Sequence, residues 1–578
     1  MKNFIFKRVV ILSDTQKSAS QFVFQKKYNL ITGGLDHSVG KTSLVKAMLW
    51  AIGCEPHDLS KSWKALDCKV YVECDIGEDQ CVIYRYQNIM KLSVNGEPFQ
   101  RFSKITGQYA SVFADLVGFS VLLPNRPPKN QEPVLETPPP AYYFLPFYVD
   151  QKKGWSEVWN GFDKLGQFAD WKRKVIRFHT GYLLPEYFGI EEEIYEYKKK
   201  ESVAQNEIKR INTALEVVDE YVPRTQFTID NQELEKITKE VRETLRELSI
   251  EQENILNELS RLTSDKYHLD AQLDLVTEAS QELEEDYKFS VENIEGDELE
   301  CPLCGTYHDN TIISKAEILA DKQQLKMQEN GLRKQLKSLD KNISRLNFKL
   351  DRVREDIQDI NRKYTIEDSE GKRLELVDIV DSLASSAVQK NVTHTKEQKQ
   401  LASKKANDKQ KELKKEQGKL LTKKDKEERN EHFLARLESN IQKLSASGVN
   451  LNGVKSPEDH RKILKDGGAA ESTRAILAYH ASTIDMIKTF GSEALAPFII
   501  DTPRQHEQND FSYKCIIDLI LSGLPHEQQI FLCALNDPVI ESYKEKAKVI
   551  TLNKKDKLLG NGDYKKLRDE LEDIINFE

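Results

Sequence analysis

The sequence NLITGGLDHSVGKTSLVKAMLWAIG, residues 29–53, joins a short apolar run to a glycine-containing loop and then to a helix-forming segment. Such a loop, which here ends in Gly40-Lys41-Thr42-Ser43, can hold phosphate groups through its backbone N–H groups and the following helix N-terminus. In that setting Lys41 reaches the β- and γ-phosphate oxygens, and the Thr42 hydroxyl is a ligand of Mg²⁺. The stretch therefore predicts a nucleotide-binding loop at the start of a helix.

This loop is one residue longer than the standard pattern G-x-x-x-x-G-K-[ST]. Leu35 stands where the first glycine belongs, and a glycine lies one position earlier. A chance Gly-Lys-Thr before a helix is the alternative, which the partner motif described next counts against. The loop residues expected to contact ATP are Gly34, Gly40, Lys41, Thr42 and Ser43.

The partner motif is APFIIDTPRQHEQND, residues 496–510, in which a strand-like apolar run ends in Asp501. A buried strand that delivers a carboxylate to its carboxyl end is what a Mg²⁺ site beside phosphates requires. Upstream, Gly467 and Gly468 precede a helix-forming stretch. In ABC-type ATPases such a pair belongs to the signature loop, which closes over the γ-phosphate held by the other protomer; a plain turn at a helix start is the alternative.

Two softer correspondences follow the same ABC-type pattern. In the sequence YVDQ, Gln151 stands where the Q-loop glutamine senses Mg²⁺ and the attacking water. After the apolar run 529–535, Asn536 and Asp537 stand where a switch-loop histidine often lies. The nucleotide site is therefore predicted to be split between the two ends of the sequence.

Between these ends, apolar residues recur at alternating steps of three and four, the spacing of a coiled-coil seam. Before a CPLCG sequence the seam residues are Val241, Leu245, Leu248, Ile255, Leu259, Leu262, Leu269, Leu273 and Val276, with Gln252 and Lys266 at the skipped positions. After it they are Leu325, Leu332, Leu336, Leu339, Ile343, Leu346, Leu350, Val353, Ile357 and Ile360. Helices joined by a short turn run antiparallel, so one seam is expected to pack on the other within the chain. A parallel dimeric coiled coil and a compact bundle are the alternatives, and breaks at 222–230 and 367–372 predict a joint.

The CPLCG sequence, residues 301–305, supplies half of a tetrahedral zinc site. The thiolates of Cys301 and Cys304 chelate one Zn²⁺ and leave two of its positions open. A second copy of the chain can supply the other two ligands, which makes an intermolecular hook. His308 as a third local ligand and a reduced cysteine pair in a loop are the alternatives. The other six cysteines are scattered and are expected to be reduced core residues.

The 578 residues are too many for one compact core, so several units are expected. The net charge of -9 excludes a protein that coats nucleic acid over its whole surface, and no apolar run approaches the roughly 20 residues of a membrane span. We expect a cytoplasmic protein without a membrane partner. Its predicted domains are an N-terminal ATPase lobe (1–185), an ascending coiled coil (186–300), the hook (301–305), a descending coiled coil (306–440) and a C-terminal ATPase lobe (441–578).

Residues 390–429 form the most basic stretch, with 14 Lys or Arg against seven Asp or Glu. Such a helix surface can follow phosphate groups without reading bases. Because a charge run is usually only a solvated helix face, the stretch nominates a region for DNA contact and does not establish one.

The order of these motifs resembles that of the SMC and zinc-hook repair ATPases, including bacterial SbcC, over the whole chain. TGGLDHSVGKTSL, FYVDQKKGW and FIIDTPRQ resemble most closely the SMC-like ATPase subunit of bacterial Lamassu-type anti-phage systems. The resemblance implies an α/β, ABC-type P-loop ATPase head made of N- and C-terminal lobes, with an antiparallel coiled-coil arm that ends in a zinc hook. It implies ATP, Mg²⁺ and Zn²⁺ as cofactors, a homodimer joined at heads and hook, and double-stranded DNA or DNA ends as ligand. The implied partners are an effector nuclease and a small accessory subunit, so the chain is expected to sense DNA and control the effector.

Two further departures from the ABC pattern concern catalysis. Thr502 follows Asp501 where a catalytic Glu is usual, which leaves the general base open, with Glu507 and Gln505 as candidates. Asp466 replaces the usual signature Ser. Slow or DNA-regulated hydrolysis is therefore expected. The residues assigned to catalysis are Lys41, Gln151, Asp501 and Glu507.

Other functions share these motifs. The main alternative is a zinc-hook ATPase of DNA double-strand-break repair that works with an exonuclease partner. An SMC clamp, whose arms are usually much longer, and a coiled-coil scaffold with a vestigial nucleotide site are further alternatives. The chain carries no recognisable nuclease motif, so any DNA cleavage is expected from a partner.

Overall fold

The computed structural model forms two compact units, which we call the head unit (Met1–Glu193 and Lys414–Glu578) and the arm unit (Ile194–Leu413). The head unit therefore combines the two ends of the chain. The residues that the structure describes are 2–34, 39–59, 63, 65–126, 133–221, 239–292, 298–300, 307–309, 312–363, 366–367, 373–374, 376–463, 469–504, 508–553, 558–560 and 563–577.

The N-terminal part of the head unit forms an antiparallel sheet. Its strand order is β2 (Ser18–Val23), β1 (Phe4–Ser13), β4 (Cys68–Ile76), β5 (Asp79–Tyr86), β6 (Ile89–Val94) and β7 (Gln100–Phe102). Successive side chains of a strand point to opposite faces, so Val9 and Ile11 of β1 enter the main core. Val10 and Leu12 face the other way and pack under the C-terminal helices α16 (Tyr564–Glu570) and α17 (Glu572–Asn576).

The second sheet of the head unit is parallel and takes strands from both ends of the chain. Its order is β10 (Tyr148–Val149), β15 (Phe498–Asp501), β16 (Ile530–Cys533), β3 (Tyr28–Thr32) and β17 (Lys548–Thr551). Every residue of β15 and β16 is buried, as expected for parallel strands covered on both faces. In a parallel sheet the carboxyl ends of the strands meet at one edge, so the segments that follow β3, β10 and β15 converge there.

Gln529, just before β16, ties the two sheets together. Its Oε1 accepts from the backbone N of Phe6 at 2.8 Å, and its Nε2 donates to the backbone oxygens of Phe6 at 2.9 Å and Gln25 at 2.8 Å. The rings of Phe6 and Phe531 meet edge to face with centroids 6.0 Å apart. Because Phe6 and Gln529 are 523 positions apart along the chain, neither end builds this core alone.

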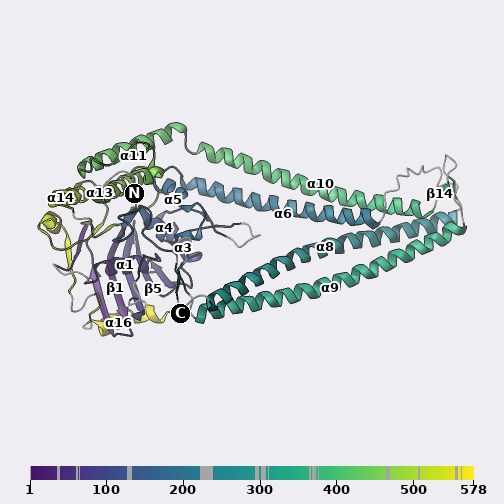
Figure 1. The fold of residues 1–578 in the computed structure, drawn as a ribbon, viewed down its shortest axis with the longest axis horizontal. Coiled ribbons are helices and arrows are strands. Elements are labelled where there is room, and N and C mark those ends of the chain that lie inside the picture. Colours follow the sequence, from purple (N-terminus) through teal and green to yellow (C-terminus); the bar gives the residue numbers. More distant parts are fainter. Residues whose placement is uncertain are drawn as a thin grey trace. The chain divides into compact units, whose positions relative to one another are not determined.

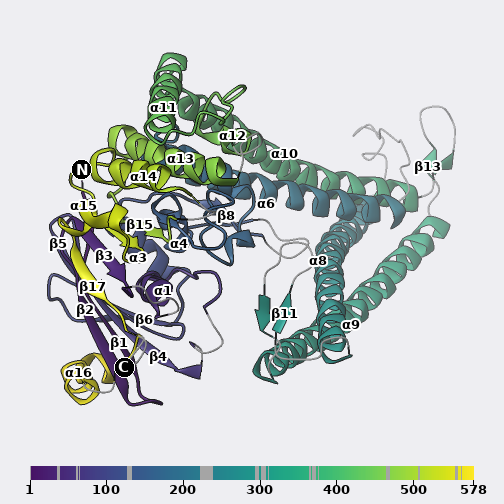
Figure 2. The same cartoon turned by 60° about the vertical axis from the view of Figure 1, so that its left-hand side comes forward.

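Helices cover the sheets, and α1 (Lys41–Ala51) packs against β4 and β5 (Figure 2). The other helices of the head unit are α3 (Gln108–Val117), α4 (Ala141–Phe144), α5 (Trp171–His179), α11 (Lys423–Lys443), α12 (His460–Ile463), α13 (Ala469–Phe490), α14 (Asp510–Ser522) and α15 (Glu541–Lys544). Shorter elements are the hairpin β8 (Leu123–Pro124) and β9 (Leu135–Glu136) and the 3-10 turns η1 (Leu145–Phe147), η2 (Leu165–Gln167), η3 (Pro457–Asp459) and η4 (Pro538–Ile540).

Arg85 on β5 closes the C-terminal end of α1. Its guanidinium donates to the backbone oxygens of Trp50 at 2.7 Å and Cys54 at 3.1 Å. It also donates to Gln87 O at 2.8 Å, pairs with Glu55 and lies 4.1 Å from the centre of the Trp50 ring. The last carbonyls of a helix have no partner within the helix, so Arg85 satisfies them and opposes the negative end of the helix dipole.

We expect Arg85→Ala to lower the free energy of unfolding by about 2–3 kcal/mol, because it removes the charged donor to the carbonyls of Trp50 and Cys54 and leaves Glu55 only its longer contact of 3.9 Å with Lys164. Arg85→Lys keeps the charge and loses the planar fork, so it should retain part of the stability. Urea denaturation of the full chain measures both variants. Equal stability of Arg85→Ala and the wild type would contradict this account of how α1 is held.

In its described residues, the arm unit consists mainly of four long helices (Figure 1): α6 (Pro185–Tyr221), α8 (Lys239–Glu292), α9 (Ile312–Lys363) and α10 (Leu376–Lys419). The first residues of α6 and the last residues of α10 belong to the head unit. Ion pairs link Lys266 to Asp340 at 2.6 Å and Glu284 to Lys322 at 3.3 Å. Glu284 follows Lys266 on α8, whereas its partner Lys322 precedes Asp340 on α9. The two helices therefore run antiparallel. Among the described residues, no helix is long and apolar enough to cross a membrane.

The expected seam residues are most deeply buried in one part of the α8–α9 pair. The buried members of the two seams are Ile255, Leu259, Leu262, Leu336, Leu346, Leu350, Val353 and Ile357. Leu256 and Ser260 of α8 lie outside the seam and are buried as well, and Asp265 pairs with Arg210 of α6 at 3.1 Å. The helix α8 therefore has a second neighbour within the arm unit, which the two-helix hairpin expected from the sequence did not include.

Short strands lie beside the breaks between these helices. β11 (Glu298–Glu300) pairs with β12 (Tyr307–Asp309), which places Leu299 opposite His308. β13 (Ile366–Glu367) pairs with β14 (Arg373–Leu374). Cys301 and Cys304 lie outside the described residues, as does most of the sequence expected to form the joint.

Candidate nucleotide site

The start of α1 has the properties of an anion site. Gly40, the residue before the helix, has φ 100°, a left-handed conformation that glycine adopts without strain. In the described part of the chain no side chain caps α1, and its first turn carries no acidic residue. The N–H groups at such a helix end lack partners and carry partial positive charge, which favours phosphate. Leu35 and its three following neighbours lie outside the described residues.

Three oxygen atoms from distant parts of the chain meet at the first turn of α1. Thr42 Oγ1 lies 3.0 Å from Gln151 Oε1 and 3.2 Å from Asp501 Oδ1. A hydroxyl has one proton and can donate to only one of them at a time. A set of carboxylate, hydroxyl and amide oxygens at this spacing suits a hard cation such as Mg²⁺. Among the described residues, Asp501 Oδ2 has no hydrogen-bond partner, which leaves a carboxylate oxygen free for such a cation.

The electrostatics of Asp501 fit the same role. The residue is fully buried, and its pKa is raised to about 6, mainly by this burial. The nearby Asp150 contributes to the rise, whereas the hydroxyls of Thr42 and Thr502 and the charge of Lys46 oppose it. A buried carboxylate in this state gains stability from a cation, because the cation replaces the lost hydration of the charged form.

The segment after β10 is folded tightly around Asp150. This carboxylate is fully buried, and its Oδ1 accepts from Tyr148 Oη at 3.0 Å and lies 3.6 Å from Lys46 Nζ. Its Oδ2 accepts from the backbone N of Lys152 at 2.9 Å and of Lys153 at 3.0 Å. Because both oxygens are engaged and shielded from water, Asp150 is unsuited to act as the general base.

The residue after Asp501 is held in an unusual conformation. Thr502 has φ 55°, which is strained for a β-branched side chain and is typical of functional sites. Its backbone N donates to Cys533 O at 3.1 Å, and its Oγ1 donates to Asp501 Oδ1 at 3.2 Å. Thr502 thus supplies a donor where ABC-type ATPases usually have a catalytic Glu. Glu507 and Gln505, the candidate bases, lie outside the described residues.

The segment after β16 contacts the start of the loop before α1. The backbone N of Asn536 donates to Gly34 O at 2.8 Å. Asp537 accepts from the backbone N of Val539 at 2.9 Å and pairs with Arg504, which also binds Asp510 at 2.7 Å. Arg504 therefore connects the segment after Asp501 to the segment after β16.

The structure brings together residues from three of the predicted motifs. Thr42, Gln151 and Asp501 meet directly, Gly34 and Gly40 flank the loop, Lys41 begins α1, and Ser43 is exposed. Gly467, Gly468 and Asp466 lie outside the described residues. Sequence reasoning missed three parts of this site: Lys46, Arg504 and Trp155, whose indole N–H donates to the backbone oxygen of Asp501 at 2.8 Å. Lys46 was detectable in principle, because it follows Thr42 by four residues and so shares its helix face.

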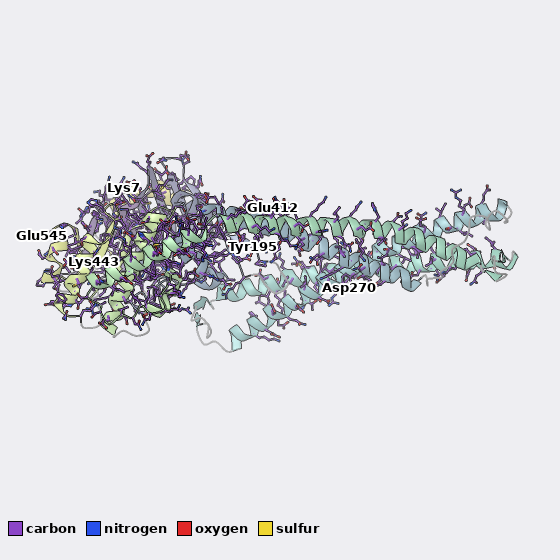
Figure 3. All side chains as sticks on the ribbon, turned by 90° about the horizontal axis from the view of Figure 1, so that it is seen from above. Lys7, Tyr195, Asp270, Glu412, Lys443 and Glu545 are labelled. Carbon is purple, nitrogen blue, oxygen red and sulfur yellow. The ribbon has the colours of Figure 1, made fainter. Side chains whose placement is uncertain are left out.

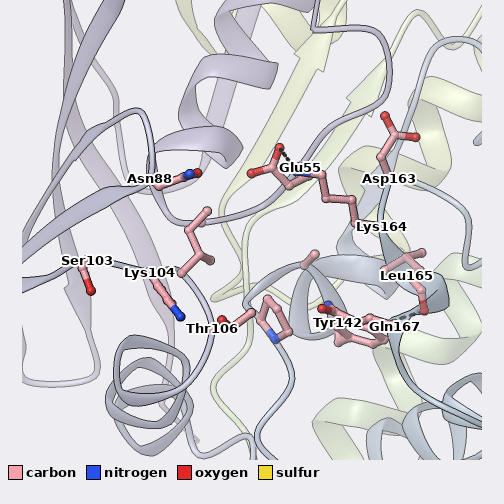
Figure 4. Close-up of a pocket in the computed structure, with 14 residues that line it drawn as sticks. Glu55, Asn88, Ser103, Lys104, Thr106, Tyr142, Asp163, Lys164, Leu165 and Gln167 are labelled. Atoms are coloured by element: carbon pink, nitrogen blue, oxygen red, sulfur yellow. Dashed lines mark hydrogen bonds and ion pairs between the residues drawn. The ribbon is translucent and has the colours of Figure 1, made fainter. Parts of the chain in front are cut away.

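A separate cavity of about 400 Å³ lies near the opposite end of α1 (Figure 4). Its lining includes Gly53, just beyond the end of the helix, and the labelled side chains of Glu55, Lys104, Tyr142 and Lys164. An 11-residue helix is roughly 16 Å long, so this cavity is distinct from the site at Thr42. Within the described ranges, no three His, Cys, Asp or Glu residues are grouped to hold a metal ion.

These features resemble those of a known class of protein. A Gly-Lys-Thr loop whose contacts come from both chain ends, in a head unit interrupted by a long helical arm, is similar to the arrangement of SMC-like proteins. The chain is similar over its whole length to Lamassu protein LmuB of Bacillus cereus strain VD014, with 22% identity over 590 aligned positions that cover 100% of this chain and 99% of that protein. A second Lamassu protein LmuB, from another Bacillus strain, is 22% identical over 508 positions, which cover 85% of this chain and 86% of that protein. No protein-family model matches the chain.

Two solved structures also align with the chain over most of its length. The Smc head domain with a coiled coil and joint from Pyrococcus yayanosii has 15% identity and a TM-score of 0.36, covering 98% of this chain and 100% of that one. The recombination mediator protein RecF in its ATPrS form has 12% identity and a TM-score of 0.25, covering 93% of this chain and 94% of that one.

Proposed function

We propose that this chain is the ATP-binding and ATP-hydrolysing subunit of an anti-phage defence complex, in which it senses DNA and controls a separate effector, a nuclease. The observation that carries the ATP part is the meeting of Thr42, Gln151 and Asp501 at the uncapped start of α1. Homology to Lamassu protein LmuB supports the role in defence. The effector and a small accessory subunit are the partners that this role requires.

In this proposal each group has a distinct task. The N–H groups at the start of α1 and the Lys41 ammonium bind the phosphates. Thr42, Gln151 and Asp501 hold Mg²⁺, which neutralises phosphate charge when bound. Gly467 and Gly468 of a second copy complete the site, so the heads close as a homodimer only when nucleotide lies between them. The general base is left unassigned.

The DNA contact is proposed for the basic stretch 390–429. In its α10 part, Ala406, Gln410 and Leu413 are buried, whereas the lysines at 404, 405, 411, 414 and 415 are exposed. Glu412 is labelled among the outward-pointing side chains of this region (Figure 3), and it pairs with Lys409 at 2.8 Å. Such a face with excess positive charge fits contact with phosphates, with affinity that falls steeply as salt rises.

The experiment that tests the proposed function uses the full chain purified with the products of its neighbouring genes. We expect linear double-stranded DNA to raise the rate of ATP hydrolysis and, in the presence of the effector, to switch on nuclease activity. Copurification with a phosphodiesterase-type exonuclease instead would favour the repair alternative. Absence of ATP binding by the wild-type chain would refute the ATP part of the proposal.

The proposed zinc hook has its own test. Because two thiolates per chain fill half of a tetrahedral site, we expect about one Zn²⁺ per two chains, held by Cys301 and Cys304. Changing both residues to Ser should remove this zinc and weaken dimerisation through the arm, with ATP binding unaffected. Metal analysis and analytical ultracentrifugation measure the two effects. Cys515→Ser, which changes a free and partly exposed cysteine of the head unit, is the matched control. Retention of the full zinc content in the double variant would exclude the hook.

A further inference from the structure

Two consecutive residues of the segment after β10 dock onto α1 one helical turn apart. Gln151 contacts Thr42 at 3.0 Å, and Asp150 lies 3.6 Å from the ammonium of Lys46. Residues four apart on a helix lie on the same face. Thr42 and Lys46 therefore present a single edge of α1 to the segment, with one polar contact at each position.

The contact at Lys46 is the buried one. Lys46 is 7% exposed and Asp150 is 0% exposed, whereas the Gln151 side chain is exposed. A buried charge is costly unless it is paired and hydrogen-bonded. The ammonium and the carboxylate neutralise each other, and their hydrogen bonds go to other groups: Lys46 donates to His57 O, and Asp150 accepts from Tyr148 and from the two backbone N–H groups described above. Separating the segment from α1 would leave each buried charge without the opposite charge. Breaking the exposed contact between Gln151 and Thr42 carries no such penalty, so the position of Gln151 depends on the neighbouring pair of Lys46 and Asp150.

The other end of the segment is also fixed. Trp155 donates from its indole Nε1 to the backbone oxygen of Asp501 at 2.8 Å. Between these ends the chain passes so close to itself that a Cβ on Gly154 would lie 2.3 Å from the backbone N of Asp150. Only glycine fits at that position, so the turn has little room to open. Gln151 is thus carried by a segment anchored on α1 and on the end of β15.

We propose that Lys46 and Asp150 are positioning residues that hold the Gln151 oxygen beside Thr42 and Asp501 before nucleotide or metal binds. The proposal rests on the proposed function for the meaning of that position, a ligand of Mg²⁺ beside ATP. It makes the glutamine a preformed part of the site and not a residue that arrives with the ligand. Loss of the pair would leave Thr42 and Asp501 in place and remove the third oxygen.

The double variant Lys46→Met with Asp150→Asn tests the proposal, since it removes both buried charges and keeps side chains of similar size. Positioning residues of this kind are worth about 10–100-fold in metal affinity or activity. We expect the Mg²⁺ concentration for half-maximal stabilisation of the ATP complex to rise at least about tenfold, measured by thermal shift. Binding of a fluorescent ATP analogue in EDTA should stay within about twofold, and kcat should fall more than KM changes.

Hydrogen exchange on the nucleotide-free chain gives an answer that does not depend on ATP binding. The amides of Lys152 and Lys153, which donate to Asp150, should be protected in the wild type and exchange faster in the double variant. The matched control is Asp58→Asn, which removes a neighbouring exposed pair of 2.8 Å with Lys152 and leaves the reporting amides unchanged. It should leave exchange and Mg²⁺ dependence unchanged. Lys46→Arg with native Asp150 should restore most of the Mg²⁺ response.

Two results would overturn the proposal. One is a double variant with wild-type Mg²⁺ dependence and wild-type exchange at Lys152 and Lys153. The other is a double variant in which metal-free ATP binding and Mg²⁺ dependence fall together with the melting temperature, which would indicate a purely structural role. A wild-type chain that binds no ATP would refute the proposed function instead, and the exchange measurement would still report whether the pair holds the segment.

Discussion

Lys41→Ala is expected to weaken ATP binding by at least about 100-fold and to abolish hydrolysis. The ammonium of Lys41 stands at the start of α1, where the β- and γ-phosphates would lie, and charge-assisted hydrogen bonds contribute about 1.5–3 kcal/mol each. Loss of contacts to two phosphates therefore removes about 3 kcal/mol or more of binding free energy. Titration with a fluorescent ATP analogue measures the dissociation constant.

A matched control separates this effect from a general loss of charge. Lys26→Ala removes an exposed lysine in the turn before β3, outside the candidate site. Its ATP affinity and hydrolysis rate should equal those of the wild type. Circular dichroism should show the same helix content in both variants, because Lys41 is not part of the core. Equal ATP affinities for Lys41→Ala and the wild type would show that the segment 29–53, with its loop before α1, is not the nucleotide site.

Asp501→Asn is expected to abolish hydrolysis and, without metal, to stabilise the protein. Folding raises the pKa of Asp501 from 3.8 to about 6, mainly by burial. The unfolded chain therefore releases this proton at lower pH than the folded chain does. Stability falls as pH rises from about 4 to about 6, and the full cost, up to about 3 kcal/mol, is present above that range. Asparagine cannot ionise and so avoids this cost.

Urea denaturation in EDTA at pH 8 and at pH 4 checks the sign of this effect. The variant should be the more stable protein at pH 8, and the difference should shrink toward zero at pH 4. Addition of Mg²⁺ with ATP should stabilise the wild type and not the variant. Asp115→Asn on α3, which changes an exposed carboxylate, should show neither response. A variant that is less stable than the wild type at pH 8 without metal would mean that Asp501 is compensated in some other way.

The parts of this protein that sequence alone could predict are those that depend on neighbours along the chain. The spacing of Gly40, Lys41 and Thr42 and the apolar strand before Asp501 predict a nucleotide site, because loop and helix start are consecutive in the sequence. The seams on either side of residue 301 follow from a period that a single helix imposes on its own side chains. These inferences need no knowledge of which distant residues meet.

What only the tertiary structure decided are the contacts between residues far apart in sequence. The pairing of Lys46 with Asp150 and the bonds of Gln529 to Phe6 and Gln25 leave no local pattern, because each partner alone is an ordinary polar residue. The second neighbour of α8 is of the same kind, since the heptad pattern describes one face of a helix and does not identify what covers the others.

The raised pKa of Asp501 shows the same division. Its place at the end of an apolar run follows from the sequence, and the residue type suits a metal ligand. Its pKa depends on complete burial and on the approach of Asp150 and Thr42, which come from segments hundreds of positions away. Local sequence specifies which side chain stands at the end of a strand. The surroundings that set its charge state exist only once both ends of the chain have folded into one head unit.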